Sequence, residues 1–281
     1  MLEISNIFPE DFNYNEYVKS FNFKKLLDLE SLPENANEKI KKSINSSVDP
    51  ENKIAFPPEL DDLCRLHYIV RSRKVTTILE FGVGKSTIIF ADALRLNRQK
   101  YFDYTSVNLR RKNLYECHSV DNYEEWISEC ESKFPKDLIN SSYINFYLAK
   151  LEMNMFNNRV CTYYDPIPNI CPDLIYLDGP DQFSPEKDIR GISTRHQDRM
   201  PMSGDILSFE HFLQPGTLIV VDGRTANARF LKNNFQRNWG YTYSVDFDQH
   251  FFELQEDPLG KYNNEMINHC LGLDYYKRIT N

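Results

Sequence analysis

Short apolar runs and stretches of helical spacing alternate along most of the chain. Runs that are apolar at consecutive positions predict buried strands, and they fall at residues 75–80, 114–120, 142–149, 159–164, 174–177 and 217–221. Apolar residues three and four positions apart predict helices, which we place at residues 57–74, 86–96, 122–133, 204–213 and 225–238. Two last strands, at residues 241–247 and 251–254, are close enough to form a hairpin. Strands that alternate with helices predict parallel βαβ units in a sheet covered on both faces.

This order predicts one α/β domain at residues 57–281, with a doubly wound, mostly parallel sheet that includes a C-terminal antiparallel hairpin strand. Residues 1–56 are rich in Asn, Lys, Glu and Ser with aromatic residues interspersed, and we interpret them as an N-terminal cap of short helices and irregular structure. Residues 97–113 are polar. Residues 179–203 carry proline, glycine and charge with little periodicity, which predicts a long loop.

The sequence ILEFGVGKSTIIFADAL at residues 78–94 predicts a strand, a tight turn and a helix. Gly82 and Gly84 interrupt the apolar run, and helical spacing resumes after them. Glycines at such a turn let the backbone pass close to a ligand, while the first free N–H groups of the helix face it. The stretch is therefore a candidate binding turn.

Two known glycine motifs match this turn only in part. Gly84-Lys85-Ser86 resembles the second half of a phosphate-binding P-loop, but Leu79 stands where the first glycine is required. The dinucleotide-binding pattern GxGxxG matches at both glycines and has Thr87 in place of the third.

Acidic residues stand at the ends of successive predicted strands: Glu80, Asp121, Asp165, Asp178 and Asp222. Ligands of open α/β sheets bind beyond the carboxyl ends of the strands. A single aspartate after a strand is a common turn or helix-capping residue. A carboxylate after each of five strands predicts instead that this edge of the sheet is functional.

From residue 57 to about residue 254, the chain resembles the class I S-adenosylmethionine (SAM) methyltransferases. The resemblance rests on the segments LEFGVGKST, CHSVDN, YYDPIP, PDLIYLDGPD and PGTLIVVDG, which follow the family's order, and on the closing hairpin. The family's glycine loop, acidic-x-Gly-x-Gly-x-small, is matched from Glu80 to Ser86. The resemblance implies a Rossmann-like fold and SAM as the cofactor.

The resemblance implies that these residues bind the cofactor: Glu80, Gly82, Gly84, Ser86, Thr87, Asp121 and Asp165. The glycine turn would lie under the methionine portion of SAM, Asp121 would accept hydrogen bonds from the ribose, and Asp165 would lie near the adenine amino group. Carboxylates around a sulfonium cation are electrostatically favourable. The spacing from Gly84 to Asp121 is longer than usual, and the strand at 142–149 has no obvious counterpart in the family.

Metal-dependent O-methyltransferases of this kind place an Asp after the fourth strand and an Asp-Asn after the fifth, where they hold Mg²⁺. The matching positions are Asp178 and Asp222, but Gly223 replaces the asparagine. Mg²⁺ can keep several waters, so a site on two carboxylates stays open. Without a metal, a general base must take the acceptor proton, and the catalytic candidates are Asp178, Asp181 and His196.

Three arginines follow the rim of the predicted cleft: Arg195, Arg199 and Arg224. A guanidinium binds phosphate through two parallel hydrogen bonds. The cluster therefore favours an anionic acceptor, such as a phosphorylated or nucleotide-linked sugar, and surface arginines in contact with water are the alternative. Family members often modify small molecules, including sugars destined for surface glycans.

The net charge of −8 over 281 residues disfavours nucleic acid or an anionic membrane as a partner. No apolar run approaches the roughly 18 residues that cross a bilayer, and the acidic N-terminus is unlike a signal peptide. We therefore expect a cytoplasmic protein. The 6 cysteines form no C-x-x-C pair, which predicts reduced thiols and neither a zinc site nor a disulfide framework.

The sequence thus predicts a SAM-dependent methyltransferase that acts on an oxygen of a small-molecule acceptor. Homo-oligomerisation is left open. Two alternatives remain at this stage: an NAD- or ATP-dependent Rossmann-like enzyme, and a catalytically silent protein that binds SAM or a nucleotide.

Overall fold

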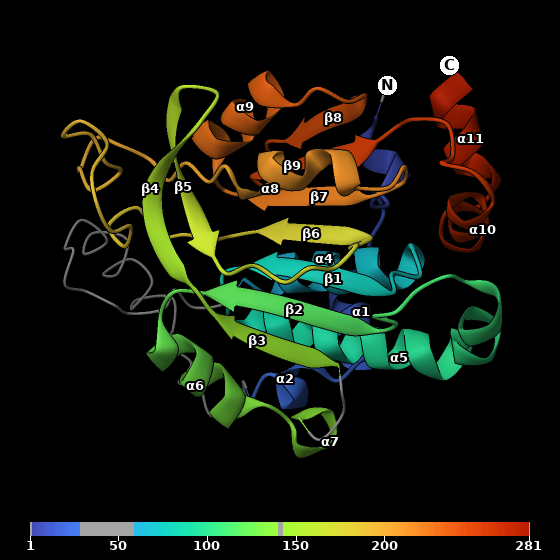
Figure 1. Ribbon diagram of the computed structural model, residues 1–281. Helices are drawn as coiled ribbons and strands as arrows, with labels where there is room; N and C mark the ends of the chain where they lie inside the picture. Colours follow the sequence, from blue (N-terminus) through green and yellow to red (C-terminus); the bar gives the residue numbers. More distant parts are fainter. Residues whose placement is uncertain (1, 29–58, 140–142, 281) are drawn as a thin grey trace.

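The computed structural model describes residues 2–28, 59–139 and 143–280, and a seven-stranded sheet forms its centre (Figure 1). In spatial order the strands are β3 (Ile144–Leu148), β2 (Glu116–Asp121), β1 (Thr77–Phe81), β6 (Leu174–Leu177), β7 (Leu218–Asp222), β9 (Gln249–Leu254) and β8 (Trp239–Ser244). The strands from β3 to β7 are parallel, and β9 runs antiparallel to both of its neighbours. The doubly wound sheet and its antiparallel hairpin strand are confirmed.

Helices cover both faces of the sheet (Figure 1). One face carries η1 (Ile4–Asn6), α1 (Tyr14–Ser20), α2 (Phe23–Leu26), α4 (Leu60–Ser72), α5 (Lys85–Asn108), α6 (Glu124–Lys133) and α7 (Lys136–Ile139). The other carries α8 (Asp205–Phe209), η3 (Glu210–Phe212) and α9 (Thr225–Asn234). Because side chains alternate along a strand, Ile78 of β1 packs into the first core while Leu79 and Phe81 pack into the second.

Helix α5 is longer than the sequence pattern predicted. It continues from the expected end at residue 96 to Asn108, through the segment we interpreted as polar and irregular. No glycine or proline interrupts that segment, so nothing local ends the helix. The side chain of Asn97 is buried and donates hydrogen bonds to the carbonyl oxygens of Val70 and Val75, which fixes α5 against α4 and the start of β1.

Strand β5 (Arg159–Asp165) does not belong to the main sheet, contrary to our prediction for residues 159–164. It pairs with β4 (Lys150–Phe156) in a separate antiparallel hairpin, and β3 takes the outer place beside β2. The hairpin stands across the carboxyl ends of the main strands (Figure 1). The expectation that five successive strands of one sheet each deliver a carboxylate to its edge is therefore wrong for Asp165.

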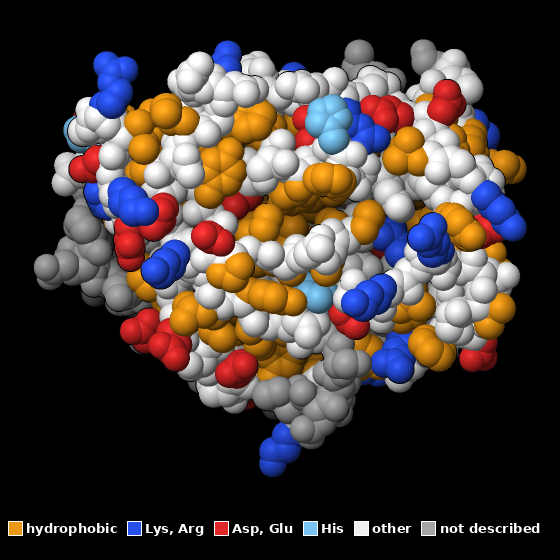
Figure 2. All heavy atoms as spheres, viewed as in Figure 1, with side chains coloured by type: hydrophobic (Ala, Val, Ile, Leu, Met, Phe, Trp, Pro, Cys, Tyr) orange, Lys and Arg blue, Asp and Glu red, His pale blue; other side chains and the backbone are white. Residues whose placement is uncertain are grey.

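The crossover from the hairpin back to β6 is extended. Residues 166–173 contain prolines at 166, 168 and 172, which remove backbone donors and disfavour a helix. Ile167 and Ile170 pack on the second core. Hydrophobic side chains gather across the middle of the face that this crossover spans (Figure 2).

The described part of the predicted N-terminal cap is helical and packs on α4. The hydroxyl of Tyr17 on α1 lies 2.8 Å from Nδ1 of the buried His67, whose Nε2 lies 3.2 Å from Asp92 of α5. The predicted boundary at residue 56 lies outside the described residues, so the division into a cap at 1–56 and a domain at 57–281 stays a prediction.

Two C-terminal helices that the sequence analysis did not predict, α10 (Lys261–Cys270) and α11 (Leu273–Thr280), lie at the opposite end of the sheet from the β4–β5 hairpin (Figure 1). Among the described residues, no helix is both long and apolar enough to cross a membrane.

A buried ion network fixes helix α11 to the sheet. Glu253 of β9 is fully buried and accepts hydrogen bonds at 2.9 Å from Arg73, which follows α4, and from Arg278 of α11. Burial alone raises the pKa of a carboxyl, but the two guanidinium groups hold the pKa of Glu253 below its usual value. The network joins three distant segments of the chain.

Replacing Glu253 by glutamine should lower the free energy of unfolding by about 3 kcal/mol at neutral pH, because two largely buried arginines lose their counter-charge. A group with a lowered folded-state pKa stabilises above its unfolded pKa and loses that contribution as pH falls through the folded value. The deficit, measured by urea unfolding, should therefore shrink in acid. D274N, which removes the exposed Asp274–Lys277 pair, is the control and should change nothing measurable.

Candidate active site

The sheet order reverses between β1 and β6, and this position defines the candidate site. The connection that leaves β1 runs through α5 on one face, whereas the connection that leaves β6 runs through α8 on the other. The two loops therefore separate at the carboxyl ends of neighbouring strands. In open α/β sheets a crevice forms at this switch point, and ligands bind there.

The two loops touch through glycines. Gly82, with φ +98°, follows β1, and a Cβ there would lie 3.0 Å from the backbone nitrogen of Gly179, which follows β6. A Cβ on Gly179 would lie 2.9 Å from the Gly82 nitrogen and 2.7 Å from the hydroxyl oxygen of Tyr164. Both positions need glycine, because no side chain fits between the backbones.

Gly84 has the opposite surroundings. It precedes the first residue of α5, has extended backbone geometry, and a Cβ built on it meets no protein atom within 4 Å. A ligand can approach the backbone here, next to the free N–H groups of the helix start. Of the two glycines in the turn, Gly82 serves the packing and Gly84 faces open space.

Glu80 lies beneath the turn and not in the open crevice. Its fully buried carboxylate accepts hydrogen bonds from the hydroxyls of Ser86 at 2.5 Å, Thr87 at 2.7 Å and Ser119 at 2.6 Å. Burial raises the pKa of Glu80 to about 7, and the three hydroxyls oppose that rise. Three of the predicted cofactor residues thus bond to one another and organise the turn.

Asp121 connects the turn to the end of β2. Its carboxylate oxygens accept backbone hydrogen bonds from Val83 at 2.8 Å and Tyr123 at 2.9 Å, and the side chain is almost fully buried. Burial raises its pKa, and these backbone donors lower it. A carboxylate can accept about four hydrogen bonds, so the ribose role stays a prediction. Asp165, exposed at the base of the β4–β5 hairpin, is likewise untested as an adenine contact.

Asp178 and Asp222 lie beside each other because Asp178 follows β6 and Asp222 ends β7, and the last pair between these adjacent strands is Leu177 with Val221. The Asp178 side chain is half exposed, and one of its oxygens lies 3.5 Å from the Arg224 guanidinium. Partial loss of hydration raises the pKa of this half-exposed carboxyl, Arg224 lowers it, and the charge of Asp222 raises it again. A carboxyl with a raised pKa is suited to accept a proton near neutral pH.

Asp222 is held by two side chains that the sequence analysis missed. Its oxygens accept hydrogen bonds from the Tyr176 hydroxyl at 3.1 Å and the Gln249 amide at 2.8 Å. Gln249 in turn accepts from the buried Arg65 of α4 at 3.5 Å, and Arg65 also donates to the Tyr14 hydroxyl of the N-terminal segment. No local pattern marks these residues, because the contacts join strands and helices far apart in the sequence.

These surroundings do not fit a Mg²⁺ site on Asp178 and Asp222. Gly223 offers no side-chain ligand, the Arg224 guanidinium lies beside Asp178, and Tyr176 and Gln249 hold the Asp222 carboxylate from inside the protein. Among the described residues, the grouping of three acids close enough to share an ion is Glu59, Asp61 and Asp62 at the start of α4, which includes neither Asp178 nor Asp222.

The loop at 179–203 is irregular, as predicted, but it is held in place by the hairpin. Glu186 pairs with the edge of β4 through backbone bonds with Met153 and Leu151 at 2.9 and 2.8 Å. On the edge of β5, the Thr162 nitrogen donates to the Met202 carbonyl at 2.7 Å. The loop therefore continues the small sheet on both sides.

Two catalytic candidates of this loop have local roles. One oxygen of Asp181 accepts from the Phe183 nitrogen at 2.8 Å and the Ser184 hydroxyl at 3.3 Å, which is a side-chain-closed turn. The His196 ring is exposed and accepts from the Asp198 nitrogen at 3.1 Å. Their catalytic role stays a prediction, and Asp178 is the candidate that the structure places beside a second carboxylate and a cation.

Two of the three arginines brace the loop. Arg195 donates to the carbonyl oxygens of Pro185 and Lys187, and Arg199 donates to the Ser193 carbonyl at 2.6 Å. Arg224, the third, is bonded to the loop after β6. Substrate binding by Arg195 and Arg199 stays a prediction, and their bonds to loop carbonyls favour a role in holding the loop.

A contact across the crevice was also missed. The hydroxyl oxygens of Ser184, in the loop after β6, and Tyr123, in the loop after β2, lie within hydrogen-bond distance at 2.8 Å. These loops flank the glycine turn on its two sides, so the contact bridges the region above it. Tyr123 follows Asp121 by two residues, and that proximity was the available signal.

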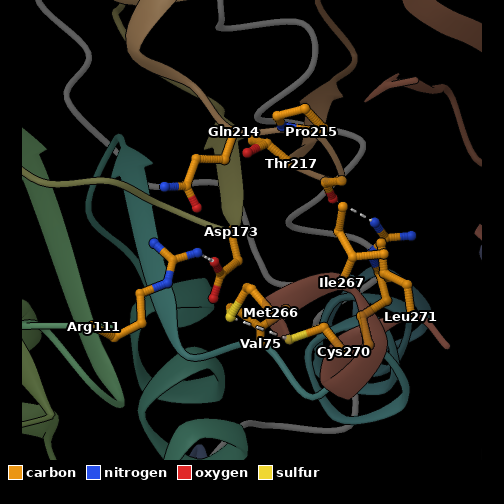
Figure 3. Close-up of a pocket in the computed structure, with 12 residues that line it drawn as sticks. Val75, Arg111, Asp173, Gln214, Pro215, Thr217, Met266, Ile267, Cys270 and Leu271 are labelled. Carbon is orange, nitrogen blue, oxygen red and sulfur yellow. Dashed lines mark hydrogen bonds and ion pairs between the residues drawn. The ribbon is translucent and has the colours of Figure 1, made fainter. Parts of the chain in front are cut away.

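A pocket at the other end of the strands contains none of the predicted site residues (Figure 3). Asp173, which precedes β6, accepts hydrogen bonds from Arg111 and from the backbone nitrogens of Thr76 and Thr77. The polar groups at this pocket thus hold the beginnings of β1 and β6 together.

The strand order and the antiparallel β9 agree with what the sequence resemblance implied. The fold is Rossmann-like, with a mostly parallel seven-stranded sheet that includes one antiparallel hairpin strand. A scan against models of protein families finds no match, and a search of curated proteins finds no relative.

A search of solved structures finds chains that are similar to this one, among them three methyltransferases. The methyltransferase PaMTH1 of Podospora anserina, bound to SAH, is 13% identical with a TM-score of 0.38, over 87% of this chain and 97% of that one. An O-methyltransferase of Bacillus cereus with SAH is 12% identical (TM-score 0.35; 85% and 98%), and TomG of Streptomyces achromogenes with SAM is 14% identical (TM-score 0.37; 86% and 98%). TM-scores of this size establish no shared activity, and the fold assignment rests on the strand order.

Substituting alanine at Gly179 and at Gly84 should have different effects on stability. G179A forces a methyl group against the Gly82 backbone and should cost about 2 kcal/mol. G84A meets open space in extended geometry and should leave the free energy of unfolding within about 0.5 kcal/mol of wild type. Urea unfolding of the two variants measures the difference, and equal losses would contradict the assigned contacts.

The buried Glu80 should make stability depend on pH. Its folded pKa of about 7 exceeds the ordinary 4.5, so between these values the folded state binds the extra proton and stability falls as pH rises. Relative to E80Q, the wild-type free energy of unfolding should fall by about 2 kcal/mol from pH 5 to pH 8. A difference that is constant with pH would show that Glu80 titrates normally.

Proposed function

We propose that the protein is a SAM-dependent methyltransferase that transfers a methyl group to an oxygen of a small acceptor. The observation that carries the proposal is the open Gly84 backbone at the switch point, with Asp121 on one side and Asp178 and Asp222 on the other. An unobstructed turn beside several carboxylates is suited to a ligand that carries a positive charge.

In this proposal the cofactor lies along the carboxyl ends of β1 and β2. Gly82 and Gly84 would lie under its methionine portion, Glu80 with Ser86 and Thr87 would shape the turn from below, and Asp121 and Asp165 would take the ribose and adenine. SAM would supply a methyl group already activated by its sulfonium. The protein then has to align the acceptor oxygen with that group, and alignment can provide most of the rate.

Asp178 is the residue we propose as the general base. It lies at the edge of β6, next to the glycine contact between the two loops, and its raised pKa favours proton uptake. Half of its side chain is accessible, so an acceptor hydroxyl can reach it. Asp181 and His196 belong to the loop above and are the second choices.

The acceptor in this proposal is a small anionic molecule, such as a phosphorylated or nucleotide-linked sugar used in glycan biosynthesis. Its support is the sequence cluster of arginines, of which Arg224 lies at the site. All three arginines donate to backbone carbonyls, and Arg224 also faces the Asp178 carboxylate, so the anionic class rests on the sequence cluster and on the position of Arg224 at the site.

Specific contacts disfavour the NAD- and ATP-dependent alternatives. The hydroxyl of Ser86, which a P-loop would use to hold the metal of a nucleotide, donates to Glu80 at 2.5 Å. Leu79, at the position of the first P-loop glycine, is buried within β1. Thr87, in place of the third dinucleotide glycine, also donates to Glu80.

Isothermal titration calorimetry with SAM, SAH, NAD and ATP-Mg²⁺ tests the proposal. SAM and SAH should bind, and G84V should weaken both by at least about tenfold while its unfolding midpoint stays at the wild-type value, because the added side chain projects into the crevice. Binding of NAD or ATP without SAM would refute the proposal. SAH release with a panel of phosphorylated and nucleotide-linked sugars then tests the acceptor class.

A further inference from the structure

The guanidinium of Arg224 lies where the two strand-end carboxylates of the site meet. Arg224 precedes the first residue of α9 and follows Asp222 by two residues, and it reaches across to the loop after β6. Its Nη1 donates to the Pro180 carbonyl at 2.6 Å, and its Nη2 donates to the Asp178 carbonyl and lies 3.5 Å from the Asp178 carboxylate. The cation is therefore fixed by the loop that carries the proposed base.

This placement leaves one polar atom unsatisfied. The Nε of Arg224 is buried and has no hydrogen-bond partner. A buried donor without a partner destabilises a fold, and native proteins keep few of them. A functional role for the position of the guanidinium would explain why this unpaired donor is kept.

The Asp222 carboxylate is held by protein hydrogen bonds and needs no metal ion to fix its position. Tyr176 and Gln249 each donate to one of its oxygens, and Gln249 is itself linked to the buried Arg65. The Asp222 carboxylate is thus hydrogen-bonded from inside the protein, and Arg224 lowers its pKa from the other side. Asp178 is compensated from the open side by Arg224.

We propose that Arg224 is the permanent cation of the site, so that methyl transfer needs no divalent metal. The inference rests on the proposed methyltransferase function. Arg224 holds Asp178 in place and provides the positive charge that favours an oxygen losing its proton. In the step itself the acceptor O–H gives its proton to the Asp178 carboxylate, the new O–CH₃ bond forms, and the S–CH₃ bond breaks with its electrons passing to sulfur, which becomes a neutral thioether.

Titration with Mn²⁺, with free metal followed by electron paramagnetic resonance, tests the cation directly and needs no acceptor. The wild type should bind Mn²⁺ no tighter than about 1 mM at this site, and R224K should behave like it because the charge stays. R224M should bind at least about tenfold tighter, and R224M/D178N should lose that gain. R229M, at an exposed position on the same helix, is the matched control and should equal the wild type.

A further variant sharpens the result. Gly223 has φ +55°, a conformation that asparagine tolerates better than most residues, and a Cβ there meets only Asp248 at 3.6 Å. G223N/R224M should therefore bind Mn²⁺ more tightly than R224M alone, by adding a ligand. Circular dichroism confirms that each variant is folded.

Two outcomes overturn the inference. The first is that the wild type binds Mn²⁺ and that D178N abolishes this binding. The second is that R224M binds Mn²⁺ no more tightly than R229M does. Calorimetry with SAH is run on the same proteins. If the wild type does not bind SAH, the proposed function is refuted. The Mn²⁺ results decide independently whether Arg224 is the cation of the site.

Discussion

The close approach of two backbones, at Gly82 and Gly179, is the constraint on which the site depends. With no side chain at either position, the loops after β1 and β6 come within contact distance, and the Tyr164 hydroxyl closes the third side. The chain then separates to opposite faces of the sheet, so a crevice opens directly beside this contact. A side chain at either glycine would push the two loops apart and would shift Asp178, whose backbone contacts Gly82.

The acids at this edge differ in role because they differ in hydration. Glu80 and Asp121 are buried, and their carboxylates accept hydrogen bonds from hydroxyl and backbone N–H groups at the turn. Asp178 keeps half of its side chain in contact with solvent and faces Arg224. A buried carboxylate that is fully hydrogen-bonded stabilises a shape, whereas an accessible one with a raised pKa can exchange a proton.

Parts of the chain outside the parallel sheet also support this edge. The β4–β5 hairpin holds the loop at 179–203 along both of its sides, and Ser184 of that loop reaches Tyr123 beyond the glycine turn. From the other face, the N-terminal segment contacts Arg65, which leads through Gln249 to Asp222. The geometry of the site is therefore a property of the whole described fold and not of the strand ends alone.

The sequence by itself determined the elements whose signals are local: the strand at 174–177, the glycine turn, the alternation of β1, α5, β2, α6, β6, α8, β7 and α9, and the closing hairpin. These follow from apolar periodicity and from residues that end helices and strands, which act over a few positions. Only the tertiary structure decided that β3 and not β5 joins the main sheet, that Asp165 lies in the hairpin, and that Arg195 braces a loop while Arg224 lies at the site. Strand pairing and ion pairing connect residues far apart in the chain. A local sequence pattern therefore does not determine which of two similar strands joins the sheet or which of several arginines reaches the site.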